Sequence, residues 1–219
     1  TLKSQGVDLT KILGLHQFQS SDFRPHQLIT HMFMHGSFLH LFSNMFAVWM
    51  FGKVLENVWG SKRFLKFYII TGIGASLIYI GYIQLQISNL TNDMSSYEKN
   101  VFVNMNEDKW YDYSTPKKER TDTEIKEIEI INNYLKKNKY FDLRKLEDLI
   151  NTPMVGASGA LFGILLAFGM LFPNTLLYIY FALPIKAKYF VMLYGAMELF
   201  LGFKNLPGDN IAHFAHLGG

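Results

Sequence analysis

Two short stretches of this chain place a serine and two histidines among small and apolar residues. VGASGALFG, residues 155–163, holds Ser158 at the head of a long apolar run, and NIAHFAHLGG holds His213 and His216. A neutral imidazole that faces a serine hydroxyl can take its proton and make it a nucleophile. The two stretches therefore predict nucleophilic catalysis, with a serine that only packs in a membrane helix as the alternative.

Small residues can bring the serine and a histidine together from separate helices. After the serine they recur at every fourth position, in Gly159, Gly163 and Ala167. Gly218 and Gly219 follow His216 within one turn, so two such helices can approach closely. Ser158 also lies near a predicted helix start, where unpaired backbone N–H groups and the helix dipole favour a negatively charged oxygen.

A pair of hydrogen-bond donors opens an earlier apolar stretch, HMFMHGSFLHLFSN. His40 and Asn44 are four positions apart and therefore lie on one face of a helix. Both can donate hydrogen bonds without carrying a charge, which suits a pair aimed at a developing oxyanion. The alternative is that each side chain bonds a neighbouring carbonyl and serves the structure alone.

Metal binding by His31 and His35 is a further possibility, because these residues are also one helical turn apart. Zinc proteases of one large class carry H-E-x-x-H, whereas this chain has HGSFLH and no nearby glutamate to activate water. We therefore predict no metal and no other cofactor.

The composition indicates an apolar protein that contains a polar insert. Of 219 residues, 49% are hydrophobic and 18% charged, yet 24 of the 39 charged residues lie within residues 88–152. The net charge of +3 is too small to indicate nucleic acid as a partner. The absence of cysteine excludes disulfides and thiolate metal sites.

Several apolar segments are long enough to cross a bilayer, which takes about 20 residues. We expect spans at residues 38–55, 64–87, 154–172 and 189–203, and the start of another near Ile211. Glycine and alanine are frequent in them, as in closely packed membrane helices. We therefore predict an all-α polytopic membrane protein that is embedded in the lipid bilayer.

The chain divides into residues 1–87 with an outer loop and two spans, the insert 88–152, and residues 153–219 with the remaining spans. In the insert, Thr121 and Glu124 match a capping box, followed by apolar residues at helical spacing. Asp142 is expected to cap a second helix, which Pro153 would end. We interpret the insert as a solvated lid or docking surface rather than as part of the catalytic site.

Basic residues in the short links predict the orientation. The link between the first two spans carries Lys53, Lys62, Arg63 and Lys66, and the link after the third carries Lys186 and Lys188. Both links should be cytoplasmic. The insert and residues 202–210 then lie on the opposite side.

These motifs together resemble the rhomboid family of intramembrane serine proteases. The resemblance rests on HGSFLHLFSNMF, on Glu56 followed by W-G, on GASGALFG and on AHFAHLGG, and it covers everything outside the insert. It implies a bundle with a six-helix core, a Ser–His dyad and no metal. The substrates would be single-span membrane proteins whose helix is locally unstable and has a small residue at the cut.

The resemblance also assigns roles to residues. Ser158 would be the nucleophile and His216 the base, while His40 and Asn44 would be oxyanion donors beside the Ser158 backbone N–H. Phe162 would place its ring against the histidine, and His213 would be structural or gating. The motif glycines Gly156, Gly159 and Gly219 would support the site. His31 and His35 match positions that organise the outer loop.

Three departures accompany the resemblance. Many members carry Trp-Arg in the outer loop, where this chain has His26 and Gln27. The insert is not part of the minimal core. The family's first helix would precede Thr1 and its last would run past Gly219.

We expect a multi-pass protein of a bacterial inner membrane. Inactive relatives that bind or escort membrane clients are the alternative function, and a transporter is a weaker one because no span pairs acidic with basic residues.

Overall fold

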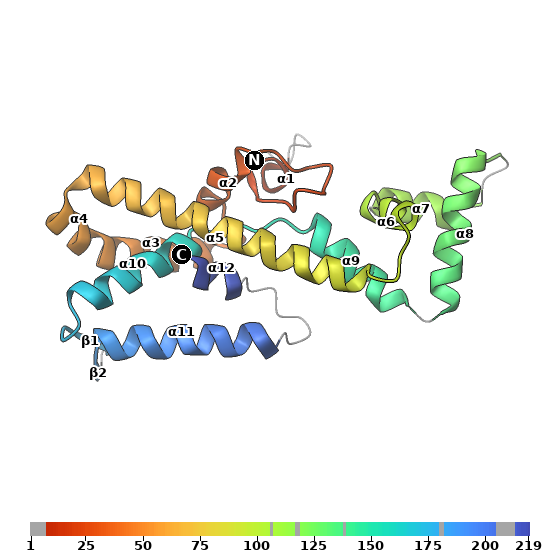
Figure 1. Cartoon of the computed structure of the whole chain (residues 1–219). Coiled ribbons are helices and arrows are strands. Elements are labelled where there is room, and N and C mark those ends of the chain that lie inside the picture. Colours follow the sequence, from red (N-terminus) through yellow and green to blue (C-terminus); the bar gives the residue numbers. More distant parts are fainter. Residues whose placement is uncertain (1–7, 106, 117–118, 138, 180–181, 205–212) are drawn as a thin grey trace. The chain divides into compact units, whose positions relative to one another are not determined.

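Helices form most of the chain (Figure 1). The computed structural model describes residues 8–105, 107–116, 119–137, 139–179, 182–204 and 213–219. It consists of two compact units. Unit 1 comprises Thr1–Leu15, Pro25–Tyr82 and Met154–Gly219, and unit 2 comprises His16–Arg24 and Ile83–Pro153.

Short helices precede the first span: α1 (Leu9–Leu13), α2 (Gln27–Thr30) and the 3₁₀ helix η2 (His31–Phe33). The side chains that replace the family's Trp-Arg pair anchor this segment. Gln27 is fully buried and its Nε2 donates to the Ile12 carbonyl at 3.2 Å, while His26 Nε2 donates to the same oxygen at 3.1 Å. Two hydrogen bonds thus hold α1 to the start of α2.

The first two predicted spans are present as long apolar helices. The first runs through α3 (Phe38–Ala47), a π-helical turn η3 (Val48–Gly52) and α4 (Lys53–Trp59), and the second is α5 (Ser61–Leu90). Gly60 separates them with φ +80°, a value that favours glycine. Only 22% and 17% of their most apolar windows are buried within the protein, as expected of helices that face lipid.

The later predicted spans correspond to α10 (Ser158–Leu171), α11 (Ala187–Lys204) and α12 (His213–Gly218). The predicted start of the third span at Met154 was wrong, since α10 begins at Ser158. Met154 instead pairs with Leu15 in an antiparallel bridge, and Gly156 has φ +124°, which no helix accommodates. Ile211 lies outside the described residues.

The link between α10 and α11 adds a feature that the all-α prediction did not contain. β1 (Leu176–Ile179) and β2 (Leu183–Lys186) pair antiparallel, with Leu176 opposite Lys186 and Ile179 opposite Leu183. This small hairpin leads directly into α11 and leaves the helical membrane fold unchanged.

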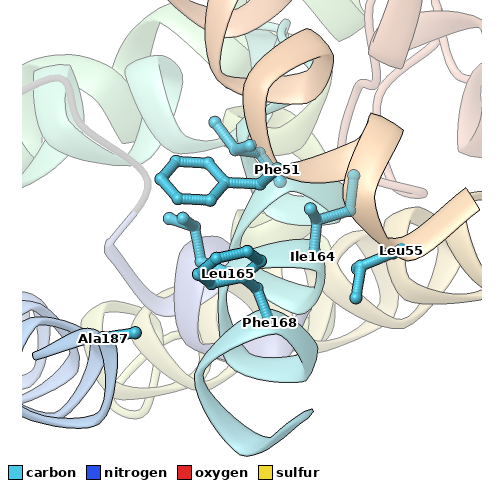
Figure 2. Packing of buried hydrophobic residues seen from close by; sticks show 7 residues of the cluster. Phe51, Leu55, Ile164, Leu165, Phe168 and Ala187 are labelled. Carbon is cyan, nitrogen blue, oxygen red and sulfur yellow. The ribbon is translucent and has the colours of Figure 1, made fainter. Parts of the chain in front are cut away.

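The core of unit 1 lies between the first span and α10 (Figure 2). Phe51 packs edge-on against Phe168, with ring centroids 5.0 Å apart. The other buried members of the cluster are Leu55, Leu161, Ile164, Leu165 and Ala187. This packing joins the end of α10 to the end of the first span and to the start of α11.

Unit 2 contains α6 (Ser96–Val103), α7 (Glu107–Ser114), α8 (Asp122–Lys136) and α9 (Tyr140–Asn151). The predicted capping box is confirmed, because Thr121 and Glu124 exchange hydrogen bonds with each other's backbone N–H. The prediction for Asp142 was wrong. It lies in the first turn of α9, whose N-cap is Lys139, and there it can interact with the helix dipole.

Candidate functional site

The structure brings Ser158 and His216 together. Ser158 is the first residue of α10 and His216 lies on α12, and Ser158 Oγ is 2.8 Å from His216 Nε2. Both side chains are partly buried. The pair therefore has the distance that proton transfer between a hydroxyl and an imidazole requires.

Glycines make this approach possible. An ideal Cβ on Gly219 would overlap the Gly159 carbonyl, and one on Gly163 would lie 2.7 Å from the Gly219 oxygen. A Cβ on Gly159 would also overlap the Ala75 side chain of α5. Three of the small residues predicted to bring the helices together, Gly159, Gly163 and Gly219, thus lie where α10 meets α12 and α5, because no larger side chain fits there.

Phe162 stacks against the imidazole of His216. It lies one turn after Ser158, and its ring is parallel to that of His216, with centroids 4.7 Å apart and an interplanar angle of 5°. Tyr194 of α11 packs against Phe162 from another side, at 4.8 Å. The predicted position of Phe162 against the histidine matches this geometry.

A carboxylate also contacts the histidine, although the family resemblance implies a dyad of serine and histidine alone. Glu198 lies in the middle of α11, is 4% exposed, and places Oε2 3.0 Å from His216 Nδ1. The same oxygen is 2.6 Å from His213 Nδ1. An acidic residue within an otherwise apolar predicted span was the signal that could have identified it.

His40 lies beside the serine because of two local features. Ser37 caps α3, its hydroxyl accepting from the His40 backbone N–H at 3.1 Å, so that His40 falls in the first turn. Gly156, whose N–H donates to the His31 carbonyl at 2.9 Å, leaves room for the ring. A Cβ there would be 2.9 Å from His40 Nε2 and 3.6 Å from Ser158 Oγ.

Asn44 follows His40 by one turn and is 5% exposed. Among the described residues, no acceptor lies within hydrogen-bonding distance of its Nδ2. A buried donor without a partner costs free energy unless a ligand supplies the acceptor. The Asn44 amide is therefore a buried donor whose hydrogen bond is not made within the described residues.

The structure does not join His31 and His35 in a metal site. His31 is buried, and its Nδ1 donates to the Gln27 carbonyl at 2.8 Å, while its Nε2 is 3.4 Å from Ser76 Oγ. Burial lowers the pKa of His31, so the imidazole is neutral near pH 7. The His35 ring instead meets His40 edge-on, at 5.0 Å.

Within the described residues, the side chains that could hold a metal ion are Glu198, His213 and His216, whose ligand atoms lie within 4.8 Å of one another. Two histidines and a carboxylate are a donor set that zinc accepts. The same atoms are already joined by hydrogen bonds, so the set does not require an ion. The predicted roles of the site residues stay predictions.

The fold and the site are those of a helical, multi-pass membrane protein. The family model for the Rhomboid domain matches residues 22–88 and 130–219. The chain therefore belongs to the rhomboid family.

Curated relatives come from Arabidopsis thaliana. RHOMBOID-like protein 12, mitochondrial, is 25% identical over 213 residues, which are 95% of this chain and 46% of that protein. RHOMBOID-like protein 6, mitochondrial, is 40% identical over 62 residues, 28% of this chain and 20% of that protein. Rhomboid-like protein 11, chloroplastic, is 38% identical over 53 residues, 24% of this chain and 19% of that protein.

The chain spans less than half the length of these relatives. Their names place them in mitochondria or chloroplasts, so the comparison lends no support to a bacterial inner membrane. No solved structure matches the chain.

Proposed function

We propose that this protein is an intramembrane serine endopeptidase, which hydrolyses peptide bonds in or beside the transmembrane segments of membrane proteins. The observation that supports this most directly is the 2.8 Å contact between Ser158 Oγ and His216 Nε2. A serine and a histidine so placed, on helices of an apolar bundle, are the parts of a general-base-activated nucleophile.

The chemistry would proceed in two stages. Ser158 Oγ bonds to the scissile carbonyl carbon while His216 Nε2 takes the hydroxyl proton. The tetrahedral intermediate then collapses, the C–N bond breaks, and the imidazolium gives its proton to the departing amine. Water repeats the sequence on the acyl-enzyme and restores Ser158.

Three donors are suited to hold the oxyanion. The Ser158 backbone N–H lies in the first turn of α10, where an N–H group has no acceptor within its own helix. His40 lies beside Ser158, and Asn44 has an unpaired amide among the described residues. Donors fixed before the reaction stabilise the transition state without reorganisation.

For substrates, we propose single-span membrane proteins with a locally unstable helix and a small residue at the cut, as the family resemblance implies. The enzyme would be multi-pass, with the insert on the non-cytoplasmic side. No cofactor and no nucleic acid partner is required by this chemistry.

Variants of the two histidines and the serine test the proposal. In reconstituted vesicles, Ser158→Ala and His216→Ala should each abolish cleavage of a transmembrane test substrate, while His213→Ala should retain substantial activity. A fluorophosphonate should label the protein at Ser158 alone. A folded protein that neither cleaves nor reacts would instead be a client-binding relative. Activity that survives His216→Ala but not His213→Ala would reverse the assignment of the base.

A further inference from the structure

A dyad of serine and histidine does not require Glu198, yet this carboxylate is buried beside it. Glu198 is 4% exposed and belongs to an 18-residue helix whose neighbouring residues are apolar. Ionisable groups at such positions are costly and serve function more often than packing. The question is what the carboxylate does for the two histidines that it contacts.

Hydrogen-bonding capacity determines the tautomers. An ionised carboxylate only accepts, so the His216 Nδ1, 3.0 Å away, and the His213 Nδ1, 2.6 Å away, must both carry hydrogen. A neutral His216 with hydrogen on Nδ1 presents the lone pair of Nε2 to Ser158 Oγ, 2.8 Å away. The opposite tautomer would point N–H at the hydroxyl and could not accept its proton.

We propose that Glu198 is a positioning residue, which holds His216 in the tautomer and orientation that activate Ser158, so that the three residues form a Ser–His–Glu triad. This inference rests on the proposed protease function. The carboxylate does not take up the proton. That proton moves from Ser158 Oγ to His216 Nε2, and the carboxylate stabilises the imidazolium until the departing amine receives it.

His213 would have a supporting role in this arrangement. By donating to the same Oε2, it holds the carboxylate from a second direction, and it lies on α12, three residues before His216. Phe162 restrains the imidazole plane by stacking, whereas Glu198 determines which nitrogen carries hydrogen. The two restraints are therefore different and complementary.

Substitution of the carboxylate by its amide tests the proposal. Glu198→Gln should lower kcat by about two to four orders of magnitude, because an amide can impose the wrong tautomer. KM should change by less than about threefold, since the substrate does not touch this residue. Glu198→Asp, which keeps the carboxylate, should recover part of the loss. The matched control is Glu129→Gln, on the exposed face of α8 and assayed with a small unselective substrate.

A spectroscopic readout separates positioning from a structural role. The measurement is the ¹⁵N NMR spectrum of protein labelled at histidine, in which the His216 signals are assigned by comparison with His216→Ala. In the wild type, the His216 hydrogen should be on Nδ1. In Glu198→Gln, the tautomer with hydrogen on Nε2 should become more populated. A His216 hydrogen on Nε2 in the resting wild type would overturn the proposal. This test needs only the wild type and therefore applies even if no variant of Glu198 folds. So would a folded Glu198→Gln variant with wild-type kcat.

These outcomes differ from failure of the proposed function. If the wild type shows no cleavage that depends on Ser158, the protease proposal fails, but the tautomer measurement still decides the role of Glu198. If zinc, added alone, displaces the Nδ1 hydrogens of the untreated wild type at stoichiometric concentration, the three groups form a metal site and the positioning role is wrong.

Discussion

His40 and Asn44 face different surroundings although they share one side of α3. The His40 ring lies beside Gly156 and Ser158 and also meets His35, whereas the Asn44 amide has no acceptor among the described residues. Each would donate one hydrogen bond to the oxyanion, in addition to the backbone N–H of Ser158. Loss of one donor should then weaken catalysis without abolishing it.

This leads to a graded prediction. His40→Ala or Asn44→Ala should slow turnover by about two to three orders of magnitude, because one oxyanion donor contributes about 2.7–4 kcal/mol to transition-state stabilisation. The measurement is kcat in detergent or vesicles, beside thermal unfolding of each variant. Asn44→Ala should not destabilise the fold, since it removes a donor that has no partner. Normal cleavage by both variants would mean that these residues only pack.

Metal dependence is the next prediction at this scale. Activity should survive EDTA and 1,10-phenanthroline, and purified protein should contain no stoichiometric zinc, because the Glu198 carboxylate already receives hydrogen bonds from both histidines. Elemental analysis and a chelator titration measure this. Chelator-sensitive cleavage that zinc restores would point to Glu198, His213 and His216 as ligands rather than to His31 and His35.

At the residue scale, the structure brings together side chains whose motifs carry their own spacing. The serine and histidine motifs select Ser158 and His216, which lie within hydrogen-bonding distance, and the turn of four residues relates Ser158 to Phe162. Glu198 has no such relation to its partners, which follow 15 and 18 positions later, beyond residues 205–212. Only the folded chain brings the carboxylate to them.

Among the elements, α10 and α12 depend on glycine for their close contact. A Cβ on Gly163 would lie 2.6 Å from Thr71 Cγ2 and 2.7 Å from the Gly219 oxygen, and one of these contacts is to backbone, which cannot rotate away. Gly195 on α11 offers a matched position, because nothing lies within 4 Å of a Cβ there. Substitutions at these two glycines therefore distinguish the effect of helix propensity on stability from the effect of packing.

Alanine at each position should act in opposite directions. Gly195→Ala should raise the free energy of unfolding by up to about 1 kcal/mol, since alanine favours helix. Gly163→Ala should lower it by about 1–3 kcal/mol, because the added methyl group overpacks the contact. It should also lower turnover by displacing His216. The free energy of unfolding of both variants is measured in the same detergent. Equal stability of the two variants would show that the helices have room to separate.

Element boundaries were harder to predict than the elements themselves. Hydropathy located the spans, but it could not place the start of α10, because the extended residues Met154 and Val155 are as apolar as the helix. The hairpin of β1 and β2 was missed for the same reason, since its apolar residues carry no turn motif among those described. In unit 2, α6 begins with a second capping box, Ser95 with Glu98, whose pattern is also present in the sequence.

At the scale of the whole molecule, the core cluster bears on orientation. Leu55, Phe168 and Ala187 belong to one buried cluster, so the basic residues on either side of Gly60 and those at the start of α11 lie at the same end of unit 1. Ser158 begins α10, and Phe168 lies near its other end. If the basic links are cytoplasmic, the serine opens toward the opposite side. Residues 88–152 lead by chain connection into α10 at that end.

The insert therefore invites a test of substrate selection. It carries most of the charge and connects α5 to the helix that bears the nucleophile, yet none of the predicted catalytic side chains belongs to it. Replacing residues 90–150 by a short flexible linker should preserve cleavage of a small unselective substrate. The choice among natural membrane proteins should change, because a module on the outer face can restrict access without altering the chemistry.

Two controls make this deletion decisive. Externally added protease should cut the insert in right-side-out vesicles, with residues 119–121 before α8 as an expected site because they lie outside the helices and helical backbone resists cleavage. Cutting only in inverted vesicles would reverse the orientation and remove the basis for selection on that face. The second control is fluorophosphonate labelling of the deletion variant. A variant that stays folded, loses labelling and cleaves no substrate would place the insert within the catalytic machinery, because access alone cannot change the reactivity of Ser158 toward a small reagent.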